Sequence, residues 1–252
     1  MIDLSPGSEA ARLTRAACTL ITNLYPTGYA HFDIHDESVR DSRCIETARA
    51  LHETLTNVGI PARLLPVDII VNNPEAYRQK QQGIPIQYWP KDAWSVGIID
   101  GQEAPPRPDT LRGWDGHMLV RVAKEWLCDP NAGQFYRPGK IHIPPGWAVE
   151  YPKDWLRDSW AIVGIVSSLA PNPNHPQFPI LQIRQRPDNL AWKRGTAATV
   201  DVSSIVNVAT EALTQLRQGE LEEQFLIRRN DGEEAVIDVA SVIERYEDGH
   251  VC

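Results

Sequence analysis

The segment from residue 43 to residue 71 constrains the fold more than any other part of this 252-residue chain. Between Arg43 and Val58, apolar residues recur at helical spacing and form one stripe, which predicts an amphipathic helix. Gly59 predicts the end of that helix, since glycine readily adopts the left-handed conformation found there, and Pro61 prevents continuation. The β-branched residues over 62–71 then predict a strand.

Cys44 lies at the start of this predicted helix. With Ser42 as the N-cap residue, Cys44 occupies the second helical position, where backbone N–H groups and the helix dipole favour a negative charge. A thiol becomes a good nucleophile only when it loses its proton. The position therefore favours a reactive cysteine over an inert core cysteine.

His117 and Asp129 belong to a predicted hairpin with strands over residues 114–122 and 126–128. If the turn is centred on Lys124, Asp129 is a diagonal neighbour of His117 on the same face of the hairpin. Diagonal neighbours are about 7 Å apart between backbones, which is within reach of a hydrogen bond between the two side chains.

Cys44, His117 and Asp129 together supply the three groups that thiol catalysis uses. Imidazole can accept the proton of the thiol, and a carboxylate can hold the imidazole in the required tautomer. These three residues are therefore the candidate catalytic residues. Cys128 points to the opposite face of the same hairpin and is predicted to be a core residue.

Periodicity and turn residues predict the remaining elements. We expect helices over residues 8–24, 74–82, 202–218 and 241–246, and strands over residues 93–99, 223–229 and 235–239. The Pro-rich stretch 171–179 is a candidate linker. It divides the chain into a core over residues 1–170 and a C-terminal extension or small domain over residues 180–252.

Composition excludes several classes of protein. The net charge of −8 argues against nucleic acid as a partner, because phosphate contacts need clustered Lys and Arg. No apolar run approaches the length of a membrane span, and the N-terminus does not resemble a signal peptide, so we expect a cytoplasmic protein without a membrane partner. The four cysteines show no metal-ligand spacing and are expected to be free thiols.

Three motifs carry a family resemblance. The run Cys44–Arg63, which ends in Gly-Ile-Pro-Ala-Arg, resembles the nucleophile helix of the transglutaminase-like superfamily and the start of the strand after it. Gly116-His117 before Met-Leu-Val resembles the histidine strand of that family. Trp126–Pro130 resembles its tryptophan, aspartate and proline segment. The resemblance spans about half of the chain, over residues 40–131.

This resemblance implies an α+β fold with a papain-like or transglutaminase-like core. In such a core the nucleophile helix packs on an antiparallel sheet; here a C-terminal α/β segment would be appended to it. The resemblance also implies Cys44 as nucleophile, His117 as base and Asp129 as the orienting acid. The implied activity is acyl transfer from peptide or protein amides, by hydrolysis or transamidation, without a cofactor or metal. The chain departs from the family pattern at Ser42 and Leu119.

Other readings remain open. The stretch His117–Gln134 is similar to arylamine N-acetyltransferases, which use an acyl-thioester donor. A binding scaffold that keeps the fold without the activity is a second alternative. A zinc site built from His31, Asp33 and His35 is a distant third. The second donor of an oxyanion hole is expected upstream of the nucleophile, with Asn23, Tyr25 and His31 as candidates, and the oligomeric state is undetermined.

Overall fold

The computed structural model describes residues 8–24, 43–99, 116–156, 159–166, 170, 172–194, 196–219, 225–228 and 234–237. Within these residues the fold is mixed α+β, with four α-helices and a curled antiparallel sheet. The helices are α1 (Glu9–Leu24), α2 (Cys44–Asn57), α3 (Pro74–Gln81) and α4 (Ser203–Gln218). The strands are β1 (Ala62–Asn72), β2 (Ser95–Ile98), β3 (His117–Val122), β4 (Trp126–Asp129), β5 (Trp147–Glu150), β6 (Trp160–Gly164), β7 (Ile180–Gln185), β8 (Phe225–Arg228) and β9 (Glu234–Ile237).

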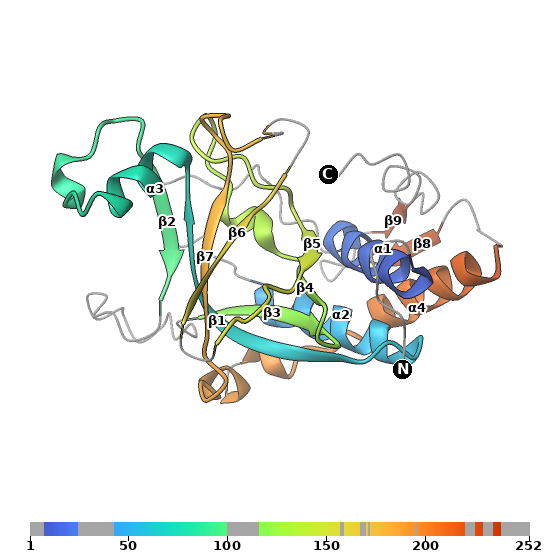
Figure 1. The fold of residues 1–252 in the computed structure, drawn as a ribbon. Helices are drawn as coiled ribbons and strands as arrows, with labels where there is room; N and C mark the ends of the chain where they lie inside the picture. The colour runs from blue at the N-terminus through green and yellow to red at the C-terminus, as the bar shows by residue number, and fades with distance from the viewer. Residues whose placement is uncertain are drawn as a thin grey trace.

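The long strand β1 organises the sheet, whose order is β5-β4-β3-β1-β7-β6. One edge of β1 pairs with β3 over residues 62–67 and then with β2 over residues 69–72, while the other edge pairs with β7. Every one of these pairings is antiparallel. The strands β8 and β9 form a separate two-stranded sheet. Helices α1 and α4 lie at one end of the large sheet, and α3 and β2 lie at the other (Figure 1).

The two faces of the sheet bury different hydrophobic clusters. On one face, alternate residues of β3 and β4 pack against α1, α2 and α4; we call this the helix-side core. On the other face, alternate residues of β1, β3, β4 and β7 form the inner core. Gln185 at the end of β7 donates a hydrogen bond to the hydroxyl of Tyr151, just after β5, at 2.8 Å. Because these strands are not neighbours in the sheet, this contact requires the sheet to curl around the inner core.

The predicted helices over residues 8–24, 74–82 and 202–218 are confirmed as α1, α3 and α4, and the strands over residues 223–229 and 235–239 as β8 and β9. Helix α2 is also confirmed, but its N-cap is Arg43, which makes no side-chain capping bond. Cys44 is therefore the first helical residue and not the second, as expected with Ser42 as the cap. Residue 42 and the predicted helix over residues 241–246 lie outside the described residues.

Three strands were not expected from the sequence: β5, β6 and β7. The strand β7 lies inside the large sheet, between β1 and β6. Helix α4 packs against α1 and α2 within the helix-side core. The expected boundary near residues 171–179 therefore does not coincide with a break in the sheet, and residues 180–218 complete the layers around β1.

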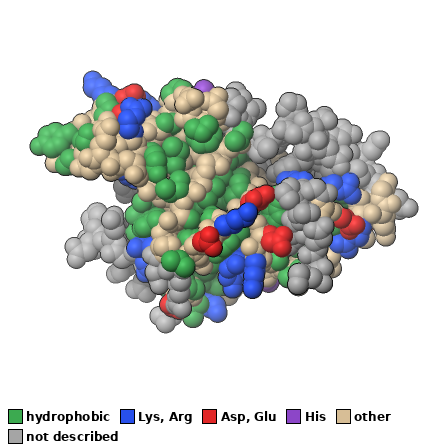
Figure 2. All heavy atoms as spheres, viewed as in Figure 1, with side chains coloured by type: hydrophobic (Ala, Val, Ile, Leu, Met, Phe, Trp, Pro, Cys, Tyr) green, Lys and Arg blue, Asp and Glu red, His purple; other side chains and the backbone are tan. Residues whose placement is uncertain are grey.

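The face of the molecule in Figure 2 carries hydrophobic side chains over the middle of the fold, bordered by a band of mixed charges. The edge strand β6 has two exposed apolar side chains: Trp160 is 37% exposed and Ile162 is 55% exposed. None of the described helices combines the length and the apolar character needed to cross a bilayer.

Candidate active site

His117 and Asp129 form the centre of the candidate site. His117 is the first residue of β3, and Asp129 is the last residue of β4, the neighbouring strand. Nε2 of His117 lies 2.8 Å from Oδ2 of Asp129. Both side chains are completely buried, with 0% exposure. A hydrogen bond between buried, oppositely charged groups is stronger than one in water, because little solvent screens it.

The register of the hairpin agrees with the sequence-based expectation. Val120 pairs with Cys128 and Val122 pairs with Trp126, so the turn is centred on Lys124. This register puts Asp129 diagonally across from His117, on the same face. Cys128 points into the helix-side core and has no exposed surface, which confirms its expected place.

The carboxylate of Asp129 is held at both oxygens. While Oδ2 faces His117, Oδ1 accepts a hydrogen bond from the backbone N–H of Asn131 at 2.9 Å. These two hydrogen bonds together fix the orientation of the carboxylate relative to the imidazole. The side-chain amide of Asn131 is buried beside it and has no hydrogen-bond partner among the residues that the structure describes.

Cys44 approaches His117 from the start of α2. Its backbone N–H precedes the first intrahelical hydrogen bond of this region, which Thr47 donates to the carbonyl of Arg43 at 2.9 Å. Cys44 belongs to the helix-side core, whereas Phe135, which contacts the ring of His117, belongs to the inner core. The candidate site therefore lies where the two cores meet.

Opposing effects set the pKa of His117. Burial lowers it, but the charge and hydrogen bond of Asp129, together with a hydrogen bond and charge from Cys44, raise it to about 10. The imidazole is therefore protonated at neutral pH. A protonated imidazole beside a cysteine stabilises the thiolate form of the sulfur.

Gln134 is a site residue that the sequence did not indicate. It lies in the 3-10 turn η5 (Ala132–Phe135) directly after β4, and its Nε2 is 2.8 Å from Nδ1 of His117. The ring of Phe135 meets the imidazole edge-on, with 5.1 Å between ring centroids. The sequence predicted a loop here, and a loop prediction gives no side-chain direction. Only the hairpin register, which brings the chain after Asp129 back to His117, pointed to this region.

Helix α1 supports the site from behind. The hydroxyl of Thr22 donates to the carbonyl of Pro130 at 3.1 Å, one residue after Asp129. Gly146 fits against this contact: a Cβ there would overlap Thr22 and come within 3.2 Å of the backbone oxygen of Asp129. Close packing between α1 and the residues before β5 therefore fixes the position of Asp129.

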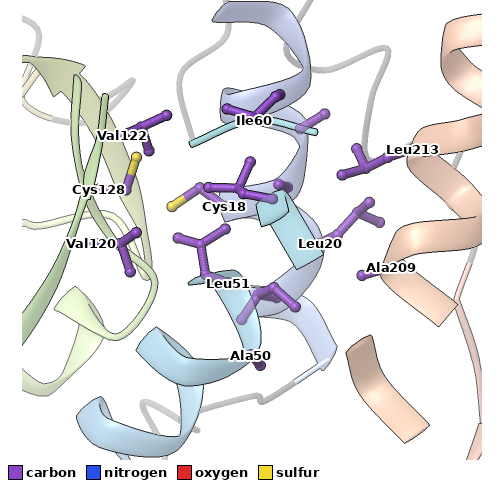
Figure 3. Close-up of a cluster of buried hydrophobic side chains, with 14 of the residues drawn as sticks. Cys18, Leu20, Ala50, Leu51, Ile60, Val120, Val122, Cys128, Ala209 and Leu213 are labelled. Carbon is purple, nitrogen blue, oxygen red and sulfur yellow. The ribbon is translucent and has the colours of Figure 1, made fainter. Parts of the chain in front are cut away.

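Two cysteines lie beneath the candidate site but not within it. Cys18 of α1 and Cys128 of β4 lie next to each other in the helix-side core (Figure 3). The thiol of Cys18 donates to the backbone oxygen of Trp147 at 3.3 Å. A hydrogen bond with Cys128, burial, and the charges of Cys128 and Asp129 raise the pKa of Cys18 well above its usual range. Cys18 therefore remains a neutral thiol, as expected for a core cysteine.

Of the other expected site residues, the structure describes Asn23 alone. Asn23, a candidate oxyanion donor, is exposed and donates its amide to the carbonyl of Thr19 at 2.8 Å. Tyr25, and His31, Asp33 and His35 of the possible zinc site, lie outside the described residues. In the part of the chain that is described, no group of His, Cys, Asp and Glu side chains could hold a metal ion.

The three candidate catalytic side chains are buried, whereas Gln134 beside them is half-buried. Cys44 is 2% exposed, and His117 and Asp129 have no exposed surface.

Comparisons with known proteins give no family. No family model matches the chain, and no curated protein matches it. Among solved structures, the chain is similar to a crystal structure of a structural-genomics target, with 11% identity and a TM-score of 0.40. That similarity covers 92% of this chain and 90% of the other chain.

Proposed function

We propose that this chain is a cysteine-dependent acyl-transfer enzyme that acts on peptide or protein amides, with a core of the papain-like or transglutaminase-like kind. One observation carries the proposal: His117 bridges Asp129, at 2.8 Å, and Cys44 at the start of α2. A nucleophilic thiol needs an imidazole that accepts its proton and a carboxylate that orients the imidazole, and His117 and Asp129 supply these two groups.

Each residue has one role in the proposed mechanism. The Cys44 thiolate attacks the amide carbonyl, and a C–S bond forms as the carbonyl π electrons move to oxygen. When the tetrahedral intermediate collapses, the C–N bond breaks and His117 gives its proton to the leaving amine. Asp129 holds the ring and stabilises its charged form. The backbone N–H of Cys44 is a candidate donor to the oxyanion.

The acyl-enzyme is a thioester that is released by a second attack. Water yields a carboxylic acid, and a primary amine yields a new amide. In both cases neutral His117 accepts the proton of the attacking group and returns to its charged form, and the C–S bond then breaks to release the Cys44 thiolate. The proposal therefore covers both hydrolysis and transamidation.

The burial of the site favours one second candidate. Because Cys44 is only 2% exposed, the fold is also compatible with a scaffold that binds partners and performs no chemistry. Acylation distinguishes the two functions, since a scaffold does not transfer acyl groups to Cys44.

The test uses p-nitrophenyl acetate, a small activated ester. The proposal predicts an acetyl group on Cys44, found by peptide mass mapping after rapid acid quenching, and an initial burst of one equivalent of p-nitrophenolate per chain. Cys44→Ala and His117→Ala should each lose this modification. Equal acetylation of Cys44 in the His117→Ala variant, or none in the wild type, would contradict the proposal.

The acceptor is then identified with natural donors. Incorporation of a fluorescent primary amine into casein indicates transamidation, and release of ammonia or new N-termini without incorporation indicates hydrolysis. Acetyl transfer from acetyl-coenzyme A to aniline would instead assign the chain an arylamine N-acetyltransferase activity.

A further inference from the structure

Gln134 contacts the ring nitrogen of His117 that Asp129 leaves available. Asp129 occupies Nε2 at 2.8 Å, and the amide of Gln134 lies 2.8 Å from Nδ1. Proton exchange between the imidazole and a thiol must therefore use Nδ1. The Gln134 amide and the Cys44 sulfur consequently compete for, or share, the same ring position.

Hydrogen bonds to the backbone of Gln134 and of its neighbour Gly133 hold this part of the turn in place. Arg137 donates from Nη1 to the carbonyl of Gln134 at 2.9 Å, and Gly133 donates its N–H to the carbonyl of Pro145 at 3.0 Å. Phe135, the next residue, is 1% exposed and packs against the same imidazole. These contacts hold the backbone of the turn η5 (Ala132–Phe135) next to His117, which keeps the Gln134 side chain within reach of the ring.

A carboxamide can serve both forms of the ring. Its NH₂ group donates to the lone pair of a neutral imidazole, and its oxygen accepts the N–H of an imidazolium. The two orientations differ by rotation of the terminal amide, whose nitrogen and oxygen have nearly the same shape. The structure has Nε2 of Gln134 at Nδ1. Because a protonated ring has no lone pair there, the terminal amide must rotate to present its oxygen when His117 is charged.

We propose that Gln134 is a positioning residue that retains the proton on His117 until the leaving amine takes it. This inference rests on the proposed acyl-transfer function. It names Gln134 as the residue that controls proton loss from His117, the general acid. The acceptor bond from Gln134 exists in the charged ring and is replaced by a donor bond in the neutral ring. Gln134 therefore affects loss of the proton from His117, which sets the alkaline limit of activity.

Two substitutions of Gln134 shift the His117 titration in opposite directions. Gln134→Leu removes both donor and acceptor, so the His117 midpoint should fall by about one pH unit, as expected when one hydrogen bond to a charged group is lost. Gln134→Glu supplies an acceptor with a full charge and no donor, so the midpoint should rise. The readout is the ¹⁵N chemical shift of His117 in histidine-labelled protein, followed from pH 6 to pH 11.

Gln185→Leu is the control, because Gln185 is a buried glutamine that contacts Tyr151 and not His117. This variant should leave the His117 midpoint unchanged. A Gln134 side chain that only fills space would lower thermal stability without moving the midpoint in either direction. Equal midpoints in wild type, Gln134→Leu and Gln134→Glu would overturn the inference. If the leucine variant does not fold, the glutamate variant decides: a raised midpoint supports the inference and an unchanged midpoint overturns it.

The inference and the proposed function fail separately. The proposed function fails if Cys44 of the wild type is not acetylated by p-nitrophenyl acetate, whatever the His117 midpoint is. The inference fails if substitution of Gln134 leaves the His117 titration midpoint unchanged, even when Cys44 is acetylated normally.

Discussion

His117 and Asp129 share a 2.8 Å hydrogen bond between two side chains that have no exposed surface. The charge of Asp129 is the main reason, and this bond the next, why the pKa of His117 rises to about 10 despite the opposing effect of burial. The protein therefore keeps a positive charge inside the fold at neutral pH. That charge stabilises the fold through Asp129 and, in the proposed mechanism, activates Cys44.

The first prediction concerns stability and pH. Folded protein keeps the His117 proton up to about pH 10, whereas an unfolded histidine loses it near pH 6.5. The stabilisation of the folded state by protonated His117 is fully present below about pH 6.5 and is lost as the pH rises through about 10. Between these limits the folded state binds more protons, so His117 lowers the free energy of unfolding by about 1.4 kcal/mol per pH unit.

Urea denaturation at pH 6.5, 8 and 9.5 measures this dependence. His117→Gln is the control, because glutamine can donate to Asp129 but does not titrate. Subtracting the control profile removes the other titrating groups. The interpretation fails if the two proteins show the same dependence on pH.

The second prediction separates the charge of Asp129 from its hydrogen bonds. Asp129→Asn keeps an acceptor for the Asn131 N–H but removes the charge, so alkylation of Cys44 by iodoacetamide at pH 5.5 should fall at least about tenfold. Asp129→Ala also leaves buried polar groups unpaired and should lower the free energy of unfolding by about 3–5 kcal/mol. Urea denaturation and alkylation rates check the two effects. If Cys44 of the Asp129→Asn variant is alkylated at the wild-type rate, the charge of Asp129 has no role in activating Cys44, which would contradict the prediction.

The third prediction tests the packing behind Asp129. Gly146→Ala forces a methyl group against Thr22 and should destabilise the fold by about 1–3 kcal/mol. Thr22→Ala removes a hydroxyl that bonds Pro130 and should cost about 1 kcal/mol. In the double variant the hydroxyl that the new methyl would meet is absent, so its destabilisation should be clearly smaller than the sum. Additive effects within about 0.5 kcal/mol would show that the two positions do not touch.

The fourth prediction is that Cys18 and Cys128 do not react in the folded protein. Both have 0% exposure, and the raised pKa of Cys18 keeps its thiol neutral. In buffer, brief treatment with iodoacetamide should modify Cys44 and leave these two cysteines intact; in 8 M urea, all three should react. Peptide mass mapping distinguishes them. Modification of Cys18 at a rate similar to that of Cys44 would contradict the assigned packing.

The candidate site could be predicted from the sequence because strand geometry fixes parity. A turn centred on Lys124 puts His117 and Asp129 on one face and Cys128 on the other, and β3 and β4 have this register. The predicted start of α2 differs from the observed one by one residue, because helix boundaries depend on the backbone of the preceding residues.

The rest of the fold depends on long-range contacts. The strands β5 and β6 have only four and five residues, in a region rich in proline and tryptophan, and pairing with distant strands defines them. By contrast, β7 alternates between buried and half-buried residues, a pattern that its sequence already carried. Gln134 could not be predicted, because the direction of its side chain comes from packing of a 3-10 turn on His117.

The central claim is that His117 maintains Cys44 as a thiolate. The most direct test is the rate of Cys44 alkylation by iodoacetamide from pH 5 to pH 9, in wild type and in His117→Ala, with His142→Ala as a control histidine outside the site. Wild type and His142→Ala should show a rate that is nearly constant from pH 5.5 to pH 8. In His117→Ala the rate should rise about tenfold per pH unit until it levels off near pH 8.5, as for an ordinary thiol. An ordinary thiol profile in all three proteins would contradict the claim.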